Sequence, residues 1–245
     1  MANNGYILYD GPSLIDGKPI VVIATVKSNN RKTGAMVQTW IIRSDIDPIT
    51  ASRKGEDFSI CGDCIHRGIA HDGDKGQAKE RSCYVMLLAV NGIYKTYHAG
   101  KYEDARGHEK TRAVGLLLGV RLGSYGDPMA CPSFVWDSLT SGASFVTAYT
   151  HQQNNLKEYV MTSADSLRDA ESAWQRGERT FRVISALDKL VRGQEVLCPA
   201  SKEAGERVQC ADCKLCGGAS VKAKSVAIVA HGAAHVTRAA KERVE

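Results

Sequence analysis

The stretch Leu116-Leu-Leu-Gly-Val-Arg-Leu122-Gly-Ser-Tyr-Gly126-Asp127-Pro128 decides the fold, because an apolar run ends there in a glycine-rich, polar turn. The next segment, residues 132–139, has a pattern typical of a helix. Apolar runs with polar ends, often followed by helix-like segments, recur from here towards the carboxyl terminus. This alternation predicts strand–helix units around a mostly parallel sheet.

Strands and helices are also predicted along the rest of the chain. Later strands are expected at 144–149, 158–162, 179–184, 195–197 and 225–230, with helices at 167–177 and from about 233 to 245. Strands are also expected at 5–9, 19–26 and 36–43, followed by a short helix from Asp47-Pro48 to Gly55. We therefore expect an α/β fold, a partial or complete βα barrel of the TIM type with an N-terminal β-rich extension. Residues 1–58 would form the extension and 59–245 the barrel-like domain, together one compact unit.

Four cysteines lie close together near the carboxyl terminus, at Cys198, Cys210, Cys213 and Cys216. The short gaps among the last three let their thiolates turn onto one centre, and Cys198 adds a fourth ligand from a preceding element. The group therefore predicts a complete metal site. Zinc favours two paired knuckles, whereas three closely spaced cysteines with one remote cysteine are typical of a [4Fe–4S] cluster. The spacing leaves both metals open.

A second group consists of Cys61, Cys64 and Cys83. His66 or His71 would complete a zinc site of three thiolates and one imidazole. The alternative is an iron–sulfur cluster that lacks one protein ligand, so that a substrate or cofactor can bind the remaining iron. The sequence predicts a metal site in a cysteine-rich loop without deciding between these two.

Polar residues follow the expected strands at equivalent places: Asp127, His151, Asp165, Cys198 and His231. In parallel α/β folds, ligands bind beyond the carboxyl ends of the strands, where the loops converge. A barrel would gather these side chains around one mouth. We expect Asp127, His151 and Asp165 to orient a substrate or move protons there.

The composition of the chain predicts the cellular compartment in which these sites would operate. The chain has 245 residues, a formal net charge of +5 and eight cysteines. It contains no apolar run as long as a membrane span and no signal-peptide pattern at its N-terminus, which predicts a cytoplasmic protein without membrane contact. In such a reducing compartment, clustered cysteines are metal ligands more often than disulfides.

A second class of function is nucleic-acid binding by a zinc-stabilised protein. The loop 27–34 is basic and polar, and Tyr94, Tyr97 and Tyr102 alternate with basic residues. Such residues meet phosphates and stack on bases. The competing interpretation is an amphipathic helix that packs its aromatic side chains inward.

A third hypothesis is a cysteine nucleophile. Cys131 is the cysteine outside both groups, and it precedes the expected helix 132–139, whose N-terminus would lower its pKa. His151 would serve as its base. The competing interpretation is a buried small residue at the start of a helix.

The chain resembles a phage- and prophage-encoded protein family whose barrel and cysteine pattern are similar to those of radical S-adenosylmethionine enzymes. The resemblance is carried by Cys61-Gly-Asp-Cys64, Arg81-Ser-Cys83-Tyr84, residues 120–128, 149–152 and 161–165, and the C-terminal cysteine segment. It implies one or two [4Fe–4S] clusters, with S-adenosylmethionine bound near Tyr84, Gly123 and Gly126.

The expectation is therefore an iron–sulfur protein of phage origin that acts on an unknown small-molecule or macromolecular substrate in the host cytoplasm. The alternative is a zinc-stabilised nucleic-acid-binding protein of phage replication or host takeover. In the radical enzymes the three cysteines share one short loop, whereas Cys83 lies well beyond Cys64. Closing the longer loop costs only about 0.6 kcal/mol for each doubling of its length.

Overall fold

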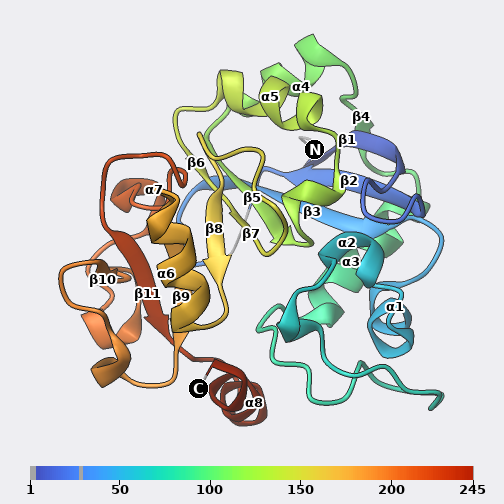
Figure 1. The fold of residues 1–245 in the computed structure, drawn as a ribbon. Helices are drawn as coiled ribbons and strands as arrows, with labels where there is room; N and C mark the ends of the chain where they lie inside the picture. Colours follow the sequence, from blue (N-terminus) through green and yellow to red (C-terminus); the bar gives the residue numbers. More distant parts are fainter. Residues whose placement is uncertain (1–3, 28–29, 245) are drawn as a thin grey trace.

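The structure is a computed structural model that describes residues 4–27 and 30–244 (Figure 1). The strands are β1 (Gly5–Pro12), β2 (Pro19–Thr25), β3 (Met36–Arg43), β4 (Glu103–Asp104), β5 (Gly119–Tyr125), β6 (Val146–Thr147), β7 (Tyr149–Thr150), β8 (Met161–Ala164), β9 (Thr180–Ile184), β10 (Glu195–Leu197) and β11 (Ser225–Val229). The α-helices are α1 (Pro48–Lys54), α2 (Phe58–Cys61), α3 (Leu87–His98), α4 (His108–Gly115), α5 (Ser133–Gly142), α6 (Leu167–Gln175), α7 (Cys210–Cys213) and α8 (Ala234–Val244). Short 3-10 helices are η1 (Ile65–Arg67), η2 (Pro128–Ala130), η3 (Leu187–Lys189) and η4 (Lys202–Ala204).

The strands form two sheets. The first has the order β4-β1-β2-β3-β5-β6, and the second has the order β10-β11-β9-β8-β7. β2 is antiparallel to both of its neighbours, and every other named pair is parallel. The expected mixed α/β fold with mostly parallel strands is confirmed.

One continuous stretch of chain connects the two sheets. β6 pairs with β5 in the first sheet, and β7, which begins after the single residue Ala148, pairs with β8 in the second. Ala148 is fully buried, and its carbonyl accepts a hydrogen bond from the Met161 amide. The chain therefore passes from one sheet to the other within a single extended segment.

The expected complete barrel is wrong, because the described strands form two open sheets. The edge strands are β4 and β6 in the first sheet and β10 and β7 in the second. The N-terminal strands are also not an extension. β3 pairs in parallel with β5, so β1–β3 belong to the same sheet as the later strands. Parallel pairing between strands distant in sequence leaves no local signal, which explains why residue patterns missed it.

Several elements were read correctly from the sequence. β3 and β10 have the expected bounds, and the other expected strands and helices are present with shifted ends. At α1, the Asp47 side chain accepts hydrogen bonds from the Ile49 and Thr50 amides, and Gly55 ends the helix in a left-handed conformation. Local capping chemistry therefore predicted α1 well.

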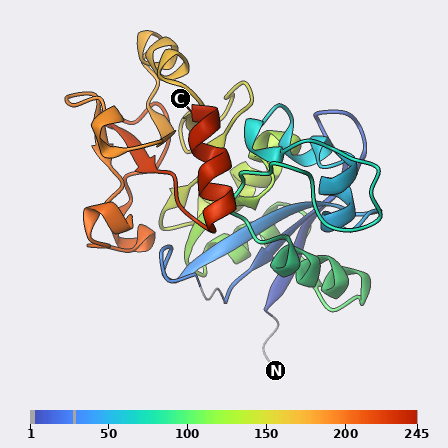
Figure 2. The ribbon, with the colours of Figure 1, turned by 90° about the horizontal axis from the view of Figure 1, so that it is seen from below.

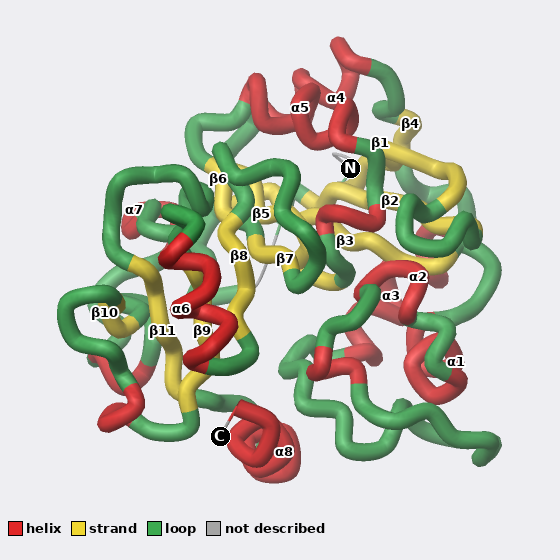
Figure 3. Tube along the Cα trace, viewed as in Figure 1, coloured by secondary structure: helices red, strands yellow, loops and turns green. Residues whose placement is uncertain are grey.

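Three hydrophobic clusters support the sheets among the described residues, and the smallest contains Ile184, Ala227 and Val229. The larger core contains the central residues of β2 and β3 together with α5, and Trp136 of α5 is fully buried in it. A smaller core under β8, β9 and β11 includes Cys198. Seen from below in Figure 2, α8 crosses the middle of the molecule, and Val236 and Ala240 are its buried residues. Figure 3 shows a long loop between η1 and α3, with α8 facing it.

No helix among the described residues is long and apolar enough to cross a membrane.

Candidate active site

A cavity of about 160 Å³ lies where the carboxyl ends of the parallel strands meet the cysteine loop. Its lining includes residues from β5, β7, β8, β9 and the end of β11, together with the segments around Cys61 and Cys83 and one residue of α8. Four of the five expected strand-end residues line it, namely Asp127, His151, Asp165 and His231. The fifth, Cys198, lies in the second core.

The loop that carries Cys61, Cys64 and Cys83 is closed by backbone hydrogen bonds. The His66 carbonyl accepts from the Ser82 amide at 3.2 Å and from the Cys83 amide at 3.0 Å. An antiparallel bridge between Ile69 and Lys79 pairs the two sides of the insertion. Cys83 is therefore held beside the Cys64–His66 segment, and all three thiols line the cavity.

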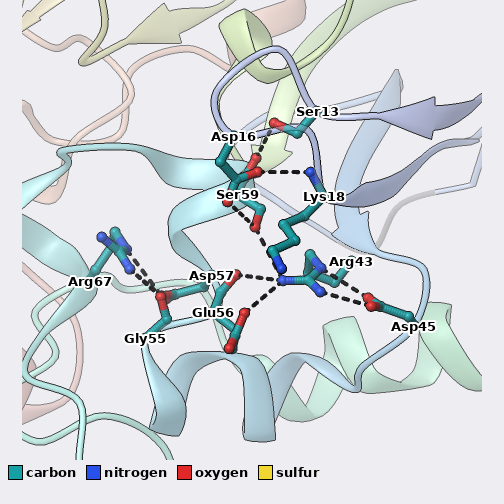
Figure 4. A network of polar contacts seen from close by, with 10 residues as sticks. All are labelled: Ser13, Asp16, Lys18, Arg43, Asp45, Gly55, Glu56, Asp57, Ser59 and Arg67. Atoms are coloured by element: carbon teal, nitrogen blue, oxygen red, sulfur yellow. Dashed lines mark hydrogen bonds and ion pairs between the residues drawn. The ribbon is translucent and has the colours of Figure 1, made fainter.

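A polar network holds the segment before Cys61 in place (Figure 4). The Arg43 guanidinium is 5% exposed and forms ion pairs with Asp45 at 2.8 Å and Glu56 at 3.0 Å. Arg67 donates to the Asp57 carboxylate at 2.8 Å and to the Gly55 carbonyl at 2.7 Å. These contacts tie α1 and α2 to η1, which fixes the backbone on both sides of the first two cysteines.

The thiols of this group affect one another's ionisation. Burial raises the pKa of Cys61 well above its ordinary value, and the neighbouring Asp57, Cys64 and Cys83 raise it further. Burial likewise raises the pKa of Cys83. Thiolates of this kind need a compensating cation, which a bound metal supplies.

His151 connects the cysteine loop to the strand ends. Its Nε2 lies 3.0 Å from Asp165 Oδ1, and Cys64 lies close enough to its ring to raise the pKa of His151. Burial acts to lower the pKa of His151, but Cys64 and Asp165 outweigh it and raise that pKa well above its ordinary value. Burial acts to raise the pKa of Asp165, but the His151 hydrogen bond holds it below its ordinary value. The two side chains therefore form a hydrogen-bonded pair on the cavity wall.

Asp127 positions the backbone beside the cavity. It is 6% exposed, and its Oδ1 accepts from the Thr150 hydroxyl at 2.7 Å and from the Met129 amide at 3.0 Å. Its Oδ2 accepts from the His151 amide at 2.8 Å. Burial raises its pKa despite these bonds. The carboxylate thus orients the His151 backbone.

The two candidate fourth ligands of the cysteine loop lie in different places. His66 lines the cavity, with its Nδ1 2.8 Å from Ser82 Oγ. Burial lowers the pKa of His66 to about 4, so that its imidazole is neutral at pH 7. His71 is outside the cavity lining and hydrogen-bonds the Gln77 carbonyl and the Gly73 amide.

The four C-terminal cysteines gather beside the smaller core. The pKa of Cys216 is raised to about 12 by burial and by the other three cysteines of the group. Burial also raises the pKa of Cys198 and of Cys210. The Cys210 amide donates to the Lys32 carbonyl at 3.0 Å, so the loop after residue 29 packs against α7.

Two arginines, Arg121 and Arg179, lie beside this group. No carboxylate is among the groups that influence their pKa values most strongly. Arg121 has as its electrostatic partners Tyr84, Tyr149 and Cys210. Arg179 donates to the Leu215 carbonyl at 2.7 Å and is raised in pKa by Cys216, although burial lowers its pKa overall. Buried cations are stable when an anion offsets them.

Two aromatic side chains lie between the two cysteine groups. Tyr149 lines the cavity, and its side chain also hydrogen-bonds Cys216. Phe181 lines the cavity, stacks on Tyr149 with ring centroids 4.4 Å apart, and packs in the core that contains Cys198. Two aromatic rings therefore lie between the cavity and the four-cysteine group.

Three buried polar atoms of cavity-lining residues have no hydrogen-bond partner among the described residues. They are Arg81 Nη2, Arg121 Nε and Tyr125 Oη. Such atoms are costly when left unpaired and indicate a ligand or solvent partner. The cavity is therefore suited to a polar ligand.

The residues expected to contact a cofactor, Tyr84, Gly123 and Gly126, all line the cavity. Tyr84 is 48% exposed and lies 5.3 Å from the His231 ring, measured between centroids. His231 Nε2 is 3.2 Å from Lys32 Nζ, which brings the basic N-terminal loop to the edge of the cavity. Residues 28–29 of that loop lie outside the described residues.

The hypothesis of a Cys131 nucleophile is wrong in its premise. Cys131 is 2% exposed in the larger core, and burial raises its pKa well above the ordinary value instead of lowering it. The His151 ring has Cys64 as its sulfur partner. Tyr94, Tyr97 and Tyr102 are partly buried against the same core, which leaves less of their rings free for base stacking.

Sequence reasoning missed the residues that support the site. Ser82 and Arg81 lie next to Cys83, and Arg121 and Tyr125 lie inside a strand. Ser82 carried no signal. The arginine at position 121, in an otherwise apolar run, was a usable signal, because a charge in a buried strand needs a partner.

Comparisons with protein-family models, curated proteins and solved structures find no match to this chain.

Proposed function

We propose that this protein is an iron–sulfur enzyme whose reactive cluster is held by Cys61, Cys64 and Cys83 and opens onto the cavity. A second cluster would be held by Cys198, Cys210, Cys213 and Cys216. One observation carries the proposal: the Cys61–Cys64 segment and Cys83 line the same cavity as Asp127, His151 and Asp165. A three-thiolate cluster leaves one iron for a cofactor or substrate.

The thiols of the described residues are not gathered as closely as the sulfur ligands of one zinc ion. Four sulfurs around one zinc lie about 3.8 Å apart, as follows from Zn–S bonds of about 2.3 Å in a tetrahedron. Among the described residues, no three thiols form a group whose ligand atoms all lie within 4.8 Å. Cysteines that bind different irons of one cluster are spread further apart.

The topology supports the finer proposal of an open, partial βα barrel similar to that of radical S-adenosylmethionine enzymes. β3, β5, the β6–β7 segment, β8, β9 and β11 are parallel neighbours in their sequence order, with β10 beyond β11. The cysteine loop follows β3, the first of them. A reactive centre beyond the carboxyl end of that strand would face the residues that follow the others.

In this proposal, Cys61, Cys64 and Cys83 would hold a cluster that, once reduced, would supply the electron for reductive cleavage of S-adenosylmethionine and so for hydrogen-atom abstraction from a substrate. The residues of the chain bind and orient. Arg81, Arg121 and Tyr125 offer unpaired donors to polar groups of the ligand. His151 and Asp165 can hold or move a proton beside it.

Metal analysis tests the proposal. The full chain, purified without oxygen, is expected to contain iron and acid-labile sulfide in equal amounts, about eight of each when both clusters are full. Cys61→Ser should lose about half of both. The matched control is Cys131→Ser, since Cys131 is buried in the larger core outside both groups. That control should keep the full content.

The reaction is tested with the same proteins. With a one-electron reductant and S-adenosylmethionine, the wild-type chain should release methionine and deoxyadenosine, and Cys61→Ser should not. Stoichiometric zinc without iron after reconstitution would overturn the iron–sulfur proposal. If iron and sulfide are present but S-adenosylmethionine is not cleaved, only the proposal of radical S-adenosylmethionine chemistry is overturned.

A second candidate, a thiol nucleophile, rests on the presence of Cys64 in the same cavity lining as the hydrogen-bonded pair His151 and Asp165. A base held by a carboxylate is the arrangement that activates cysteine nucleophiles. It predicts that His151→Ala slows alkylation of Cys64 at least about tenfold in the metal-free chain, a loss of about 1.4 kcal/mol in activation. Mass spectrometry of the modified peptide measures this rate, and an unchanged rate excludes the candidate.

A further inference from the structure

His66, His151 and Asp165 direct three ligand atoms to one point on the cavity wall. His151 Nε2 lies 3.0 Å and His66 Nε2 lies 3.7 Å from the same oxygen, Asp165 Oδ1. All three ligand atoms lie within 4.8 Å of one another. The two rings meet edge to face, with centroids 5.8 Å apart. Two imidazoles and a carboxylate converge in the way that ligands of a single ion do.

The Nε2 atom of His66 faces Asp165 without a hydrogen bond to it. The 3.7 Å separation from Asp165 is too long for a hydrogen bond, so this nitrogen faces the carboxylate without bonding to it. On the other side of the ring, Nδ1 lies 2.8 Å from Ser82 Oγ. Ser82 is 3% exposed and also accepts from Arg243 Nη1 at 2.8 Å. Metal-binding histidines are oriented by such a partner on the second ring nitrogen.

His151 and Asp165 are placed by the strands. His151 directly follows β7 and Asp165 directly follows β8, which are parallel neighbours. The Asp127 carboxylate fixes the His151 backbone through the amide hydrogen bond of 2.8 Å. The third member, His66, comes from η1 in the cysteine loop. The group therefore joins both walls of the cavity.

We propose that His66, His151 and Asp165 bind one divalent first-row transition-metal ion, separate from the cysteine clusters. Two histidines and one carboxylate are a common ligand set for such ions and leave further positions open. Those positions would face the cavity, where a substrate oxygen or water can bind the ion. No thiol belongs to the set, so this site stands without the iron–sulfur proposal.

Hard and soft metal ions prefer different ligands, so a suitable ion can bind this site in preference to the cysteine groups. Thiolates favour soft ions, whereas carboxylates accept Mn²⁺, and imidazole accepts the later transition ions. Mn²⁺ should therefore report this site and not the cysteine groups. Co²⁺ serves as a second probe, because its visible spectrum separates imidazole and carboxylate ligands from thiolates.

The experiment titrates the full chain, freed of metal by a chelator, with Mn²⁺ and with Co²⁺. Electron paramagnetic resonance of unbound Mn²⁺ gives the number bound. We expect one Mn²⁺ or one non-thiolate Co²⁺ per wild-type chain, with at least tenfold weaker binding in His66→Ala and in Asp165→Asn. His71→Ala is the matched histidine control, because His71 is outside the cavity lining and should bind as wild type. Near-ultraviolet circular dichroism checks that each variant is folded.

The proposal is overturned if neither ion binds stoichiometrically to the wild-type chain, or if folded His66→Ala and Asp165→Asn bind as tightly as wild type. Iron and sulfide are measured separately on oxygen-free preparations of the same variants. Loss of the Mn²⁺ or Co²⁺ site with full iron and sulfide separates failure of this site from failure of the clusters.

Discussion

Gly126 occupies a backbone position that glycine alone fills without strain. Its φ is +82°, and a Cβ would lie 2.7 Å from Ile41 Cβ and 2.9 Å from the Ile41 carbonyl oxygen. Ile41 is fully buried in β3 and cannot move aside cheaply. This residue lets the end of β5 pass close to its neighbour and brings Asp127 to the cavity.

Gly126→Ala should therefore lower the free energy of unfolding by about 3 kcal/mol or more, the sum of left-handed backbone strain and overpacking. Gly177→Ala is the control, because Gly177 has a φ of +74° with no atom within 4 Å of the added Cβ. It should cost about 1–2 kcal/mol. Urea unfolding of both variants measures the difference, and equal losses would refute the packing argument.

At the same scale, the sequence predicted residues whose role depends on type and spacing. The cysteines are recognisable from their close spacing, and the polar residues from their shared position after apolar runs. Ser82 was not, since a serine gains its role only when the fold brings it to His66. Likewise, only the fold shows that Cys64, and not the expected Cys131, is the cysteine near His151.

At the scale of elements, Glu178 ties the second sheet to its surroundings. Its carboxylate is 6% exposed and accepts from Lys157 Nζ at 2.7 Å, Thr162 Oγ1 at 3.1 Å and the Arg176 guanidinium at 3.2 Å. Thr162 belongs to β8, and Arg176 ends α6. One side chain thus joins the turn before β9 to three neighbouring segments.

Glu178→Gln should lower the free energy of unfolding at pH 7 by about 1–2 kcal/mol, because a buried carboxylate with cationic partners is removed. Burial acts to raise the pKa of Glu178, but its donors hold it below the ordinary value of 4.5. The contribution is therefore present above pH 4.5 and is lost as the pH falls through the lowered pKa.

Urea unfolding at pH 7 and at pH 3 checks this expectation. Glu171→Gln, on the exposed face of α6, is the control and should change stability little at either pH. A difference between wild type and Glu178→Gln that stays the same at pH 3 would show that charge is not its source.

Elements with strong local signals were predictable, whereas α4 and the pairing of the strands were not. The capping residues Asp47 and Gly55 and the apolar runs carry their own local signals, so α1 and β3 could be placed. The antiparallel insertion of β2 between β1 and β3, and the division into two sheets, depend on which edges meet. Those contacts are between distant residues, and a single sequence does not encode them as a local pattern.

At the scale of the whole molecule, α8 links the second sheet to the cysteine loop (Figure 2). It packs on β9, and Ala240 lines the cavity. Arg243 near its end donates to the Glu80 carbonyl at 2.6 Å and to Ser82 Oγ at 2.8 Å. The C-terminal helix therefore braces the loop that holds Cys83.

Arg243→Ala should speed hydrogen exchange of the Ser82 and Cys83 amides about tenfold, which corresponds to about 1.4 kcal/mol and fits one lost charge-assisted hydrogen bond. Arg238→Ala is the matched control, because Arg238 is exposed on the same helix. Exchange measured by mass spectrometry on peptides covering residues 80–85 tests this. Equal protection in the two variants would refute the bracing role.

The passage of the chain from β6 through Ala148 to β7 has a consequence for how this molecule can be divided. A cut on either side of that segment removes a strand from the edge of one sheet and exposes unpaired backbone groups, which invite aggregation. Neither half is therefore expected to fold as an independent domain. Shuffling or truncation that separates residues 1–145 from the remainder should yield insoluble fragments, and the two cysteine groups must be inherited together.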